Sequence, residues 1–227
     1  RSLIGLSLDL FRLGLHSDMQ TIGELLVLLG TVAFAVTAVL AVVDRGIDLF
    51  GAIVLGIITA VGGGTIRDLI LDVPVFWAID TSYIWVALMA SVFAFLARSV
   101  LARKHMNSLF LYIDALGAAL FAVQGTVKVW DYGFGLPFAP VMLGVATAIG
   151  GGLIRDVLAG RRNLLMSREL YAVPITLGCV LLTLILSYLP EYRYYGSLGC
   201  FALIFGLRAG VIYWQLIVPD WFTTKAR

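Results

Sequence analysis

The sequence predicts an all-α integral membrane protein with seven transmembrane helices, arranged as two inverted three-helix repeats followed by a seventh helix. Three observations carry this prediction: the composition, the spacing of long apolar stretches, and a motif that occurs twice. Of the 227 residues, 61% are hydrophobic and 13% are charged, and the mean hydropathy is +0.99. Soluble domains are about half apolar and about a quarter charged, so this composition places the chain in a bilayer.

The remaining composition excludes several classes of function. The formal net charge is +2, and no run of Lys or Arg is long enough to form a nucleic-acid patch, so we expect no nucleic-acid partner. The sequence has no phosphate-binding Gly-x-x-x-x-Gly-Lys motif, and its two histidines, His16 and His105, lie outside the apolar stretches. We therefore expect no enzymatic activity, no metal site and no cofactor.

Seven long stretches with few charges predict the membrane-spanning helices. A hydrocarbon core about 30 Å thick requires about 20 residues of helix. Tyr and Trp residues gather near the ends of these stretches, where an aromatic ring lies between water and lipid. The expected spans cover residues 22–43, 47–71, 81–97, 107–129, 136–158, 170–189 and 194–216.

The Lys and Arg residues between the spans predict the orientation of the chain. Most of them fall on one face, in connections such as 98–104 and 161–168, whereas the opposite face has few. Because cytoplasmic loops carry the excess of positive charge, we expect a cytoplasmic C-terminus and an N-terminus on the outside. Membrane lipid is the expected environment and partner of the chain.

Residues 1–18 are interpreted as an N-terminal extension. Charged residues, among them Asp9, Arg12 and Asp18, interrupt this segment too often for the apolar core of a signal peptide. Met19 is the expected natural start of the protein, and an interfacial amphipathic segment is the alternative interpretation. No function is assigned to these residues.

An internal repeat is the most informative feature of the sequence. The motif Gly-Gly-Gly-x-x-Arg-Asp occurs at 62–68 and again 88 residues later at 150–156, and Phe-Ala-Val occurs at 34–36 and again at 121–123. Each repeat contains three spans, so the second copy must enter the membrane from the opposite side. The predicted divisions are repeat 1 at 19–106, repeat 2 at 107–190, and the seventh helix with the C-terminal tail at 191–227.

The seventh span stands outside the repeat and is rich in glycine. Gly199, Gly206 and Gly210 include one pair of small residues at a spacing of four. Such a pair lets another helix approach closely, so ordinary helix packing is the expected role of this span.

Two glycine triplets lie near the middle of the second and fifth spans. Each glycine costs roughly 1 kcal/mol relative to alanine in a helix, and lipid offers the backbone no alternative partners. We therefore expect helices 2 and 5 to be broken at the triplets, with close helix packing as the alternative. The triplets consist of Gly62, Gly63, Gly64, Gly150, Gly151 and Gly152.

An Arg-Asp pair follows each triplet, as Arg67-Asp68 and Arg155-Asp156. A charge buried in a membrane costs about 2.5 kcal/mol or more, so each of these residues needs a partner. Neighbouring positions on a helix point about 100° apart, which argues against pairing within the motif. We predict crossed contacts between Arg67 and Asp156 and between Arg155 and Asp68. The four charges then act either as a static clamp or as the lining of a permeation path.

The fourth span carries two further polar residues, Asp114 and Lys128. They lie about 21 Å apart along a helix, so they cannot pair with each other. Lys128 either extends its ammonium group to the interface or serves at a gate or pore mouth, and Asp114 has a similar pair of interpretations. At a helix break, exposed carbonyl groups suit a small cation and exposed amide groups suit an anion.

With its duplicated motif and its seven spans, the chain from Met19 onward resembles the prokaryotic trimeric intracellular cation (TRIC) channel family. The resemblance implies a homotrimer with a pore in each protomer, flanked by kinked helices 2 and 5. It implies permeation by potassium, and also sodium, in the plasma (inner) membrane of a prokaryote. Lys128 resembles the basic residue of the fourth helix in this family. The pore and kink residues implied are Gly62, Gly63, Gly64, Arg67, Asp68, Gly150, Gly151, Gly152, Arg155 and Asp156.

The sequence departs from the animal branch of that family and also resembles a second group. The lysine- and glutamate-containing motif and the charged C-terminal tail of the animal branch have no counterpart here, so phosphoinositide binding is not expected. The same kind of bacterial sequence resembles a group described as glycine-transporter-like. Inverted repeats are common in transporters, so the alternative function is secondary transport of a small amino acid such as glycine.

Overall fold

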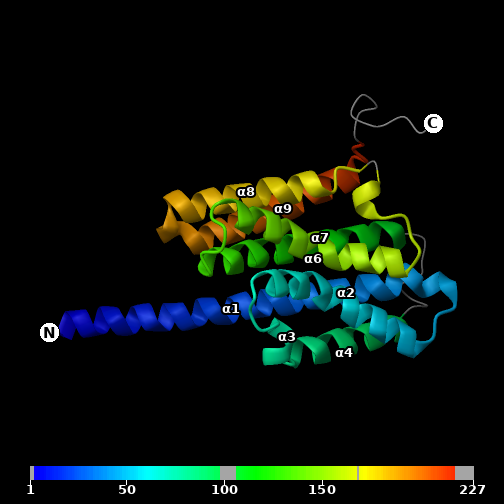
Figure 1. The fold of residues 1–227 in the computed structure, drawn as a ribbon, viewed down its shortest axis with the longest axis horizontal. Helices are drawn as coiled ribbons and strands as arrows, with labels where there is room; N and C mark the ends of the chain where they lie inside the picture. Colours follow the sequence, from blue (N-terminus) through cyan, green and yellow to red (C-terminus); the bar gives the residue numbers. More distant parts are fainter. Residues whose placement is uncertain (1–2, 98–105, 168, 218–227) are drawn as a thin grey trace.

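The computed structural model is an elongated bundle of helices that lie side by side (Figure 1). It describes residues 3–97, 106–167 and 169–217. Three short 3-10 helices, Val43–Arg45, Leu164–Met166 and Pro190–Tyr192, connect longer helices. The α-helices are α1 (Leu3–Val42), α2 (Leu49–Ile70), α3 (Phe76–Ile79), α4 (Ser82–Leu96), α6 (Met106–Asp131), α7 (Phe138–Leu158), α8 (Ala172–Tyr188) and α9 (Arg193–Tyr213).

The helices fall on the expected spans and confirm an all-helical protein of the membrane type. Five of them contain a window that is long and apolar enough to cross a membrane. α4 and α8 are also apolar, but with 15 and 17 residues they are shorter than a full span. The five candidate spans are Gly23–Arg45, Leu49–Ile70, Ser108–Asp131, Phe138–Leu158 and Pro190–Tyr213.

α1 is much longer than the first expected span. The helix runs without interruption from Leu3 to Val42, so the expected boundary after residue 18 falls inside it. Figure 1 shows that the first half of α1, drawn in dark blue, extends beyond the rest of the bundle. Outside the hydrocarbon core, isolated charges do not stop a helix, which explains why the charged segment continues the apolar one.

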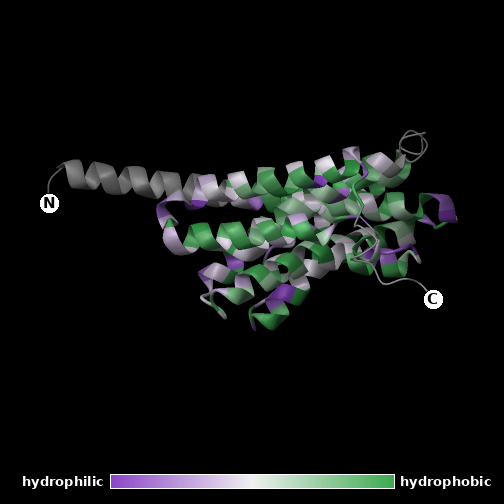
Figure 2. Ribbon diagram, turned by 90° about the horizontal axis from the view of Figure 1, so that it is seen from above, coloured by the Kyte–Doolittle hydropathy of each residue, from purple (hydrophilic) through white to green (hydrophobic). Residues whose placement is uncertain are grey.

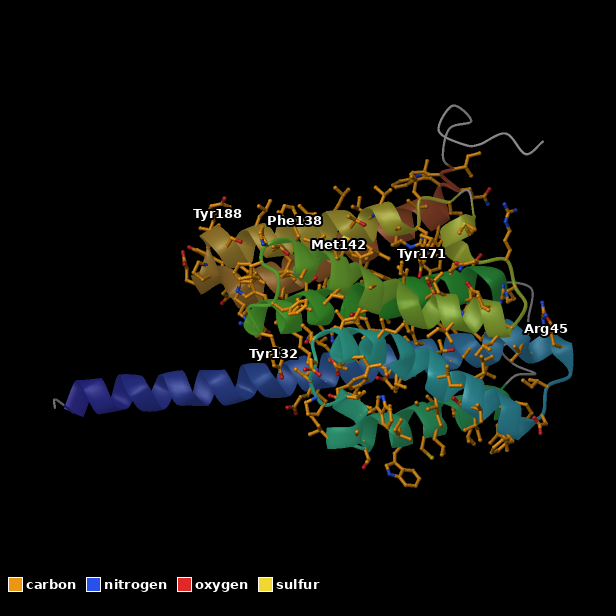
Figure 3. The ribbon with its side chains drawn as sticks, in the orientation of Figure 1. Arg45, Tyr132, Phe138, Met142, Tyr171 and Tyr188 are labelled. Atoms are coloured by element: carbon orange, nitrogen blue, oxygen red, sulfur yellow. The ribbon has the colours of Figure 1, made fainter. Side chains whose placement is uncertain are left out.

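Apolar side chains cover the outside of the bundle. Figure 2 shows hydrophobic residues along the helices, with the most hydrophilic residues mainly toward the helix ends. Phe138, Met142 and Tyr188 are 78%, 69% and 78% exposed, and Figure 3 places all three on the outer surface. An apolar surface of this extent in a bundle of apolar helices suits contact with lipid.

The duplicated Phe-Ala-Val segments pack α1 against α6 in the core. The rings of Phe34 and Phe121 lie 5.1 Å apart at an interplanar angle of 58°. Each ring lies against a glycine of the opposite helix, because Phe121 packs on Gly30 and Phe34 packs on Gly117. An added Cβ atom at Gly117 would come within 2.5 Å of the Phe34 ring. The same residues in the two copies of the repeat therefore serve the same packing role.

The expected helix breaks at the glycine triplets are wrong. α2 continues through residues 62–64 and α7 continues through residues 150–152 as α-helix. The prediction weighed the low helix propensity of glycine and omitted the packing that glycine permits. With no side chains in the way, two helix backbones approach closely, and the contacts they gain offset the propensity cost.

Candidate functional site

The candidate site begins where α2 crosses α7 at the glycine triplets. A Cβ atom added at Gly63 would collide with the carbonyl oxygen of Thr147, and one added at Gly151 would collide with the carbonyl oxygen of Thr59. A Cβ atom at Gly150 would lie 3.2 Å from the Cα atom of Gly63. The triplets therefore serve close packing at this crossing, which was the alternative interpretation of the sequence.

One turn beyond the crossing, α2 carries the first charge cluster. Both Nε and Nη2 of Arg67 lie 2.8 Å from Oδ1 of Asp68. The same carboxylate oxygen accepts a hydrogen bond from Nζ of Lys128 on α6, also at 2.8 Å. Oδ2 of Asp68 accepts from the backbone N–H of Phe76 at 2.9 Å, at the start of α3. A single carboxylate thus holds two cations.

The corresponding turn of α7 carries the second charge cluster. Nε of Arg155 donates to Oδ1 of Asp156 at 2.9 Å, and Nη1 lies 2.6 Å from Oδ1 of Asp114 on α6. Nη1 also donates to the Thr37 hydroxyl of α1 at 2.9 Å. Oδ2 of Asp156 accepts from the backbone N–H of Leu164 at 3.3 Å, as Asp68 does from Phe76. Here two carboxylates hold one central cation.

The predicted crossed pairs between Arg67 and Asp156 and between Arg155 and Asp68 are wrong. Each arginine binds the aspartate next to it in the sequence. The 100° separation applies to the Cβ directions, and the long arginine side chain bends back along the helix far enough to bridge it. The connection between the two copies of the repeat runs instead through α6 and, for Arg155, through Thr37.

α6 supplies one partner to each cluster, from positions fourteen residues apart. Asp114 pairs with Arg155, and Lys128 pairs with Asp68, so the two residues do not pair with each other, as predicted. The interpretation of Lys128 as a side chain that only extends to the interface is incomplete, because its ammonium group binds a buried carboxylate. The unexplained polar residues of the fourth span were the signal that could have identified both pairs.

Aromatic rings complete the second cluster and were not identified from the sequence. The guanidinium carbons of Arg155 and Arg161 both lie 4.5 Å from the centre of the Phe110 ring. Such cation–π contacts stabilise cations that have lost water. Burial lowers the pKa of Arg161, in the connection after α7, and the nearby Asp156 carboxylate opposes that shift. The guanidinium of Arg208 on α9 lies 4.5 Å from the centre of the Tyr171 ring.

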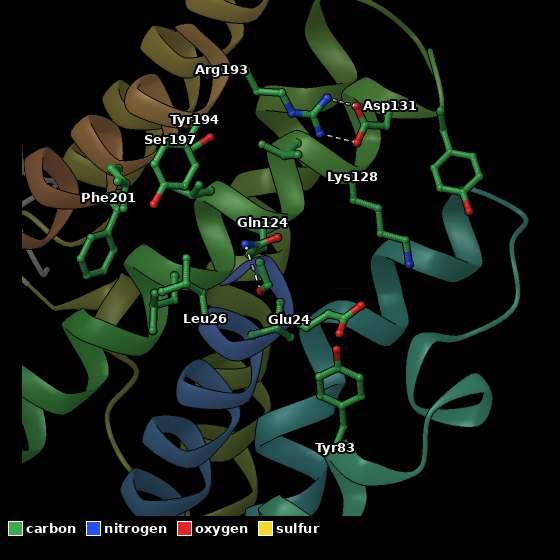
Figure 4. A pocket seen from close by; sticks show the side chains of 17 residues that line it. Glu24, Leu26, Tyr83, Gln124, Lys128, Asp131, Arg193, Tyr194, Ser197 and Phe201 are labelled. Atoms are coloured by element: carbon green, nitrogen blue, oxygen red, sulfur yellow. Dashed lines mark hydrogen bonds and ion pairs between the residues drawn. The ribbon is translucent and has the colours of Figure 1, made fainter. Parts of the chain in front are cut away.

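Two adjoining cavities border the first cluster. The larger has a volume of about 370 Å³ and lies among α1, α4, α6 and α9 (Figure 4). Its walls are mostly apolar, and charged side chains of Glu24, Lys128, Asp131 and Arg193 also line it. The smaller has a volume of about 160 Å³ and is lined by Val27, Gly64, Arg67, Phe76, Tyr83, Phe121, Gln124 and Lys128.

The rim of the larger cavity carries an ion pair of a different kind. The guanidinium of Arg193 binds both oxygens of Asp131 at 2.6 Å, and Figure 4 shows this pair above Lys128. Its side chains are 41% and 44% exposed, whereas those of Arg155 and Asp114 are fully buried. The two charge clusters also differ in access: Lys128 of the first is 26% exposed and lines both cavities, whereas Arg155 and Asp114 of the second are fully buried.

Ionisable residues inside a helical membrane bundle characteristically mark ion or substrate pathways. The apolar helices, the tight α2–α7 crossing and the charge cluster beside a cavity define a helical membrane protein of the channel and transporter class.

Solved structures share this fold over most of the chain. A TRIC trimeric intracellular cation channel orthologue from Rhodobacter sphaeroides has a TM-score of 0.81 and 34% sequence identity, covering 86% of this chain and 100% of that chain. A prokaryotic TRIC channel has a TM-score of 0.80 and 28% identity, covering 88% of this chain and 100% of that chain. The structural neighbours are thus cation channels.

Curated relatives place the chain in a family. A UPF0126 membrane protein of Vibrio cholerae is 35% identical over 226 residues, which cover 96% of this chain and 92% of that protein. The UPF0126 membrane protein YvgT of Bacillus subtilis is 41% identical over 157 residues, covering 68% of this chain and 76% of that protein. A family model described as glycine transporter matches residues 24–99 and 111–187. The chain belongs to the UPF0126 membrane protein family, the family of the prokaryotic TRIC channels.

Proposed function

We propose that the chain forms a monovalent cation channel that prefers potassium, with a pore in each protomer of a homotrimer. The observation that carries this proposal is the similarity to solved TRIC cation channels, with a TM-score of 0.81 at 34% identity. The proposed location is the plasma membrane of a prokaryote, with the C-terminus in the cytoplasm and the N-terminus outside. This orientation follows the excess of Lys and Arg on one face.

The proposed topology is two inverted repeats, at 19–106 and 107–190, with the seventh helix at 191–227. Corresponding residues in the two copies make corresponding contacts, which supports this division. Phe34 and Phe121 pack on each other's helices, and both aspartates of the repeated motif accept a backbone N–H eight residues further on. In this topology α4 and α8 complete the third and sixth spans despite their shorter length.

The proposed pore runs beside the α2–α7 crossing rather than through it. At the crossing the two backbones are in contact, which leaves no room for an ion between Gly63 and Gly151. The smaller cavity lies next to this point, since Gly64 and Arg67 line it. Conduction in this proposal passes along this side of the crossing, while α2 and α7 stay in contact at the triplets.

Lys128 is proposed to control access to this path. It lines both cavities, and its ammonium group is held 2.8 Å from Oδ1 of Asp68. A cation entering from the larger cavity would meet Arg67 and Lys128 before any carboxylate of the cluster, because Asp68 is fully buried behind them. The conformation described here is therefore proposed to be closed to cations.

The uncovered face of α9 supports the proposed trimer. Cβ atoms added at Gly199 and Gly206 would meet no atom of the described residues within 4 Å, unlike the glycines at the α2–α7 crossing. Small residues in an uncovered membrane helix allow another helix to pack closely against it. The similar structure from Rhodobacter sphaeroides is described as trimeric.

Planar-bilayer recording under a potassium chloride gradient tests the proposed activity. We expect unitary currents that reverse near the potassium equilibrium potential. Reversal at the chloride equilibrium potential would contradict cation selectivity. Replacing chloride by a larger anion at constant potassium provides the matched control, because it leaves the current of a cation channel unchanged.

Secondary transport of glycine is the second candidate function. The family model that matches residues 24–99 and 111–187 is described as a glycine transporter, and inverted repeats suit alternating access. Proteoliposomes distinguish the two activities. A transporter gives saturable uptake of labelled glycine without unitary currents, whereas a channel gives unitary currents without saturable glycine uptake.

A further inference from the structure

We propose that the smaller cavity beside the first charge cluster binds a small monovalent anion, either a halide or a short carboxylate. This inference goes beyond the proposed cation channel and does not rest on it. Arg67 and Lys128 both line this cavity of about 160 Å³, and no carboxylate is found among the described residues that line it. A cavity bordered by a guanidinium and an ammonium group, with no acid, has the electrostatic character of an anion site.

The two clusters differ in the number of carboxylates that bind each cation, and this difference favours an anion at the first cluster. At the second cluster the cation Arg155 is bound by two carboxylates, those of Asp114 and Asp156. At the first cluster the ratio is reversed, because among the described residues one carboxylate, that of Asp68, is bound to the two cations Arg67 and Lys128. An uncompensated charge in a membrane interior is costly, and a bound anion removes that cost.

Hydrogen-bond donors are available for such a ligand. Asp68 binds both cations through the single oxygen Oδ1, using Nε and Nη2 of Arg67 and Nζ of Lys128. A guanidinium has five N–H donors and an ammonium has three, so each keeps donors beyond those that Asp68 uses. Tyr83 adds a hydroxyl group and Gln124 adds a carboxamide to the lining. One donor of that carboxamide binds the Gly23 carbonyl oxygen at 3.3 Å.

The size and access of the cavity restrict the ligand. A water molecule takes up about 30 Å³ of liquid, so 160 Å³ holds a halide with a few waters or a short carboxylate. The two cavities share Val27, Tyr83, Gln124 and Lys128, so the larger one provides the route to the site. Figure 4 shows the Glu24 carboxylate beside the Tyr83 hydroxyl on that route, where it disfavours anions of higher charge.

Thermal unfolding of the purified protein with different potassium salts tests the proposal. Potassium concentration and ionic strength are held constant while the anion is chloride, bromide, formate or gluconate. We expect the three small anions to raise the unfolding midpoint in a saturable way, by about 5–10 °C at a hundred times Kd, relative to the much larger gluconate. Stabilisation by halides alone would identify a halide site, and stabilisation by formate as well would extend it to carboxylates.

Two variants separate the cavity from general salt effects. Lys128→Met removes a cation from the lining, and we expect it to abolish the difference between chloride and gluconate. Arg45→Gln is the matched control, because Arg45 is exposed and binds the carbonyl oxygen of Gly160, away from the cavity. The same chloride dependence in Lys128→Met as in the unmodified protein would overturn the proposal.

Bromide located by anomalous diffraction tests the site directly and does not depend on any variant being folded. Crystals of the unmodified protein grown in potassium bromide should show an anomalous peak within about 3.5 Å of nitrogen atoms of Arg67 and Lys128. Peaks only at surface arginines, with none in this cavity, would overturn the proposal. Neither readout involves conductance, so the anion site and the cation channel can fail independently.

Discussion

The two charge clusters arise from one repeated motif, yet they have become different kinds of site. In the second copy Asp114 pairs with Arg155, and the corresponding position in the first copy is Val27. Around Arg67, Val27 provides no charge, and Lys128 instead competes for Asp68. The comparison teaches that a repeated motif fixes the position of a charge, whereas the neighbouring helices decide whether it stabilises the fold or remains accessible to ligands.

Removing the arginine should affect the two clusters unequally, and this is the largest expected effect. Arg155→Met removes the ion-pair partner of the buried carboxylates Asp114 and Asp156, so we expect a loss of about 3–5 kcal/mol in the free energy of unfolding. Thermal or denaturant unfolding in detergent measures this change. Arg67→Met is the matched control, and its loss should be smaller, because Lys128 still pairs with Asp68 beside a cavity. Equal losses would break the comparison.

The α2–α7 crossing should tolerate no added atoms. Gly63→Ala places a methyl group against the Thr147 carbonyl oxygen, and overpacking of this kind costs about 1–3 kcal/mol. Gly206→Ala makes the same change on the uncovered face of α9, where alanine gains helix propensity, so the stability of a single protomer should not fall and any loss would come from the proposed trimer contact. Unfolding midpoints of the two variants measure the difference. An equally stable Gly63→Ala protein would show that the crossing is looser than described.

Lys128→Met should change conduction more than stability. Its side chain is 26% exposed, so loss of the ion pair should cost only about 1 kcal/mol after screening by water. Removing one positive charge from the proposed path should lower the barrier for a cation by about 1 kcal/mol, which corresponds to a roughly fivefold larger potassium conductance. Single-channel recording measures this increase. Asp114→Asn should give the reverse pattern, with a larger loss of stability and little gain in conductance.

The pair at the rim of the larger cavity should contribute least. Arg193 and Asp131 are both about 40% exposed, and exposed pairs contribute about 0.2–1 kcal/mol despite good geometry. A double-mutant cycle of Arg193→Gln and Asp131→Asn, measured by unfolding at low and high salt, gives the coupling energy. We expect it to shrink as salt screens the pair. A coupling as large as that of the buried clusters would place this rim away from water.

Much of the fold followed from the sequence because apolar runs are long and interrupted by few charges. The expected third span, 81–97, became α4 at Ser82–Leu96, and the fifth, 136–158, became α7 at Phe138–Leu158. The length of α1 did not follow, because charges in residues 1–18 indicate an end to the apolar layer and do not indicate an end to the helix. Hydropathy detects burial in lipid, whereas helix length depends on backbone hydrogen bonds.

The sequence singled out residues that the fold uses, but it did not predict their contacts. The glycine triplets meet at the α2–α7 crossing and each Arg-Asp pair forms its own charge cluster, whereas the role of these residues in a pore stays a prediction. Their partners depended on which side of α6 faces each cluster and on how far an arginine side chain bends. Neither quantity follows from spacing along one helix. Only the three-dimensional structure therefore shows the pairs with Lys128 and Asp114 and the hydrogen bond from Arg155 to Thr37.

α6 takes part in two ion pairs, one through Asp114 and one through Lys128. Asp114 binds Arg155 of α7 and Lys128 binds Asp68 of α2, and the two α6 residues lie about 21 Å apart along the helix axis. A shift of α6 along its axis would lengthen both ion pairs at once. A rotation of its C-terminal end alone would separate Lys128 from Asp68 and keep Asp114 bound to Arg155. In such a rotation the fully buried pair at Asp114 would stay in place and the partly exposed pair at Lys128 would separate. A force that acts across the membrane on the Lys128 ammonium would act over the part of α6 between Asp114 and Lys128, about 21 Å long.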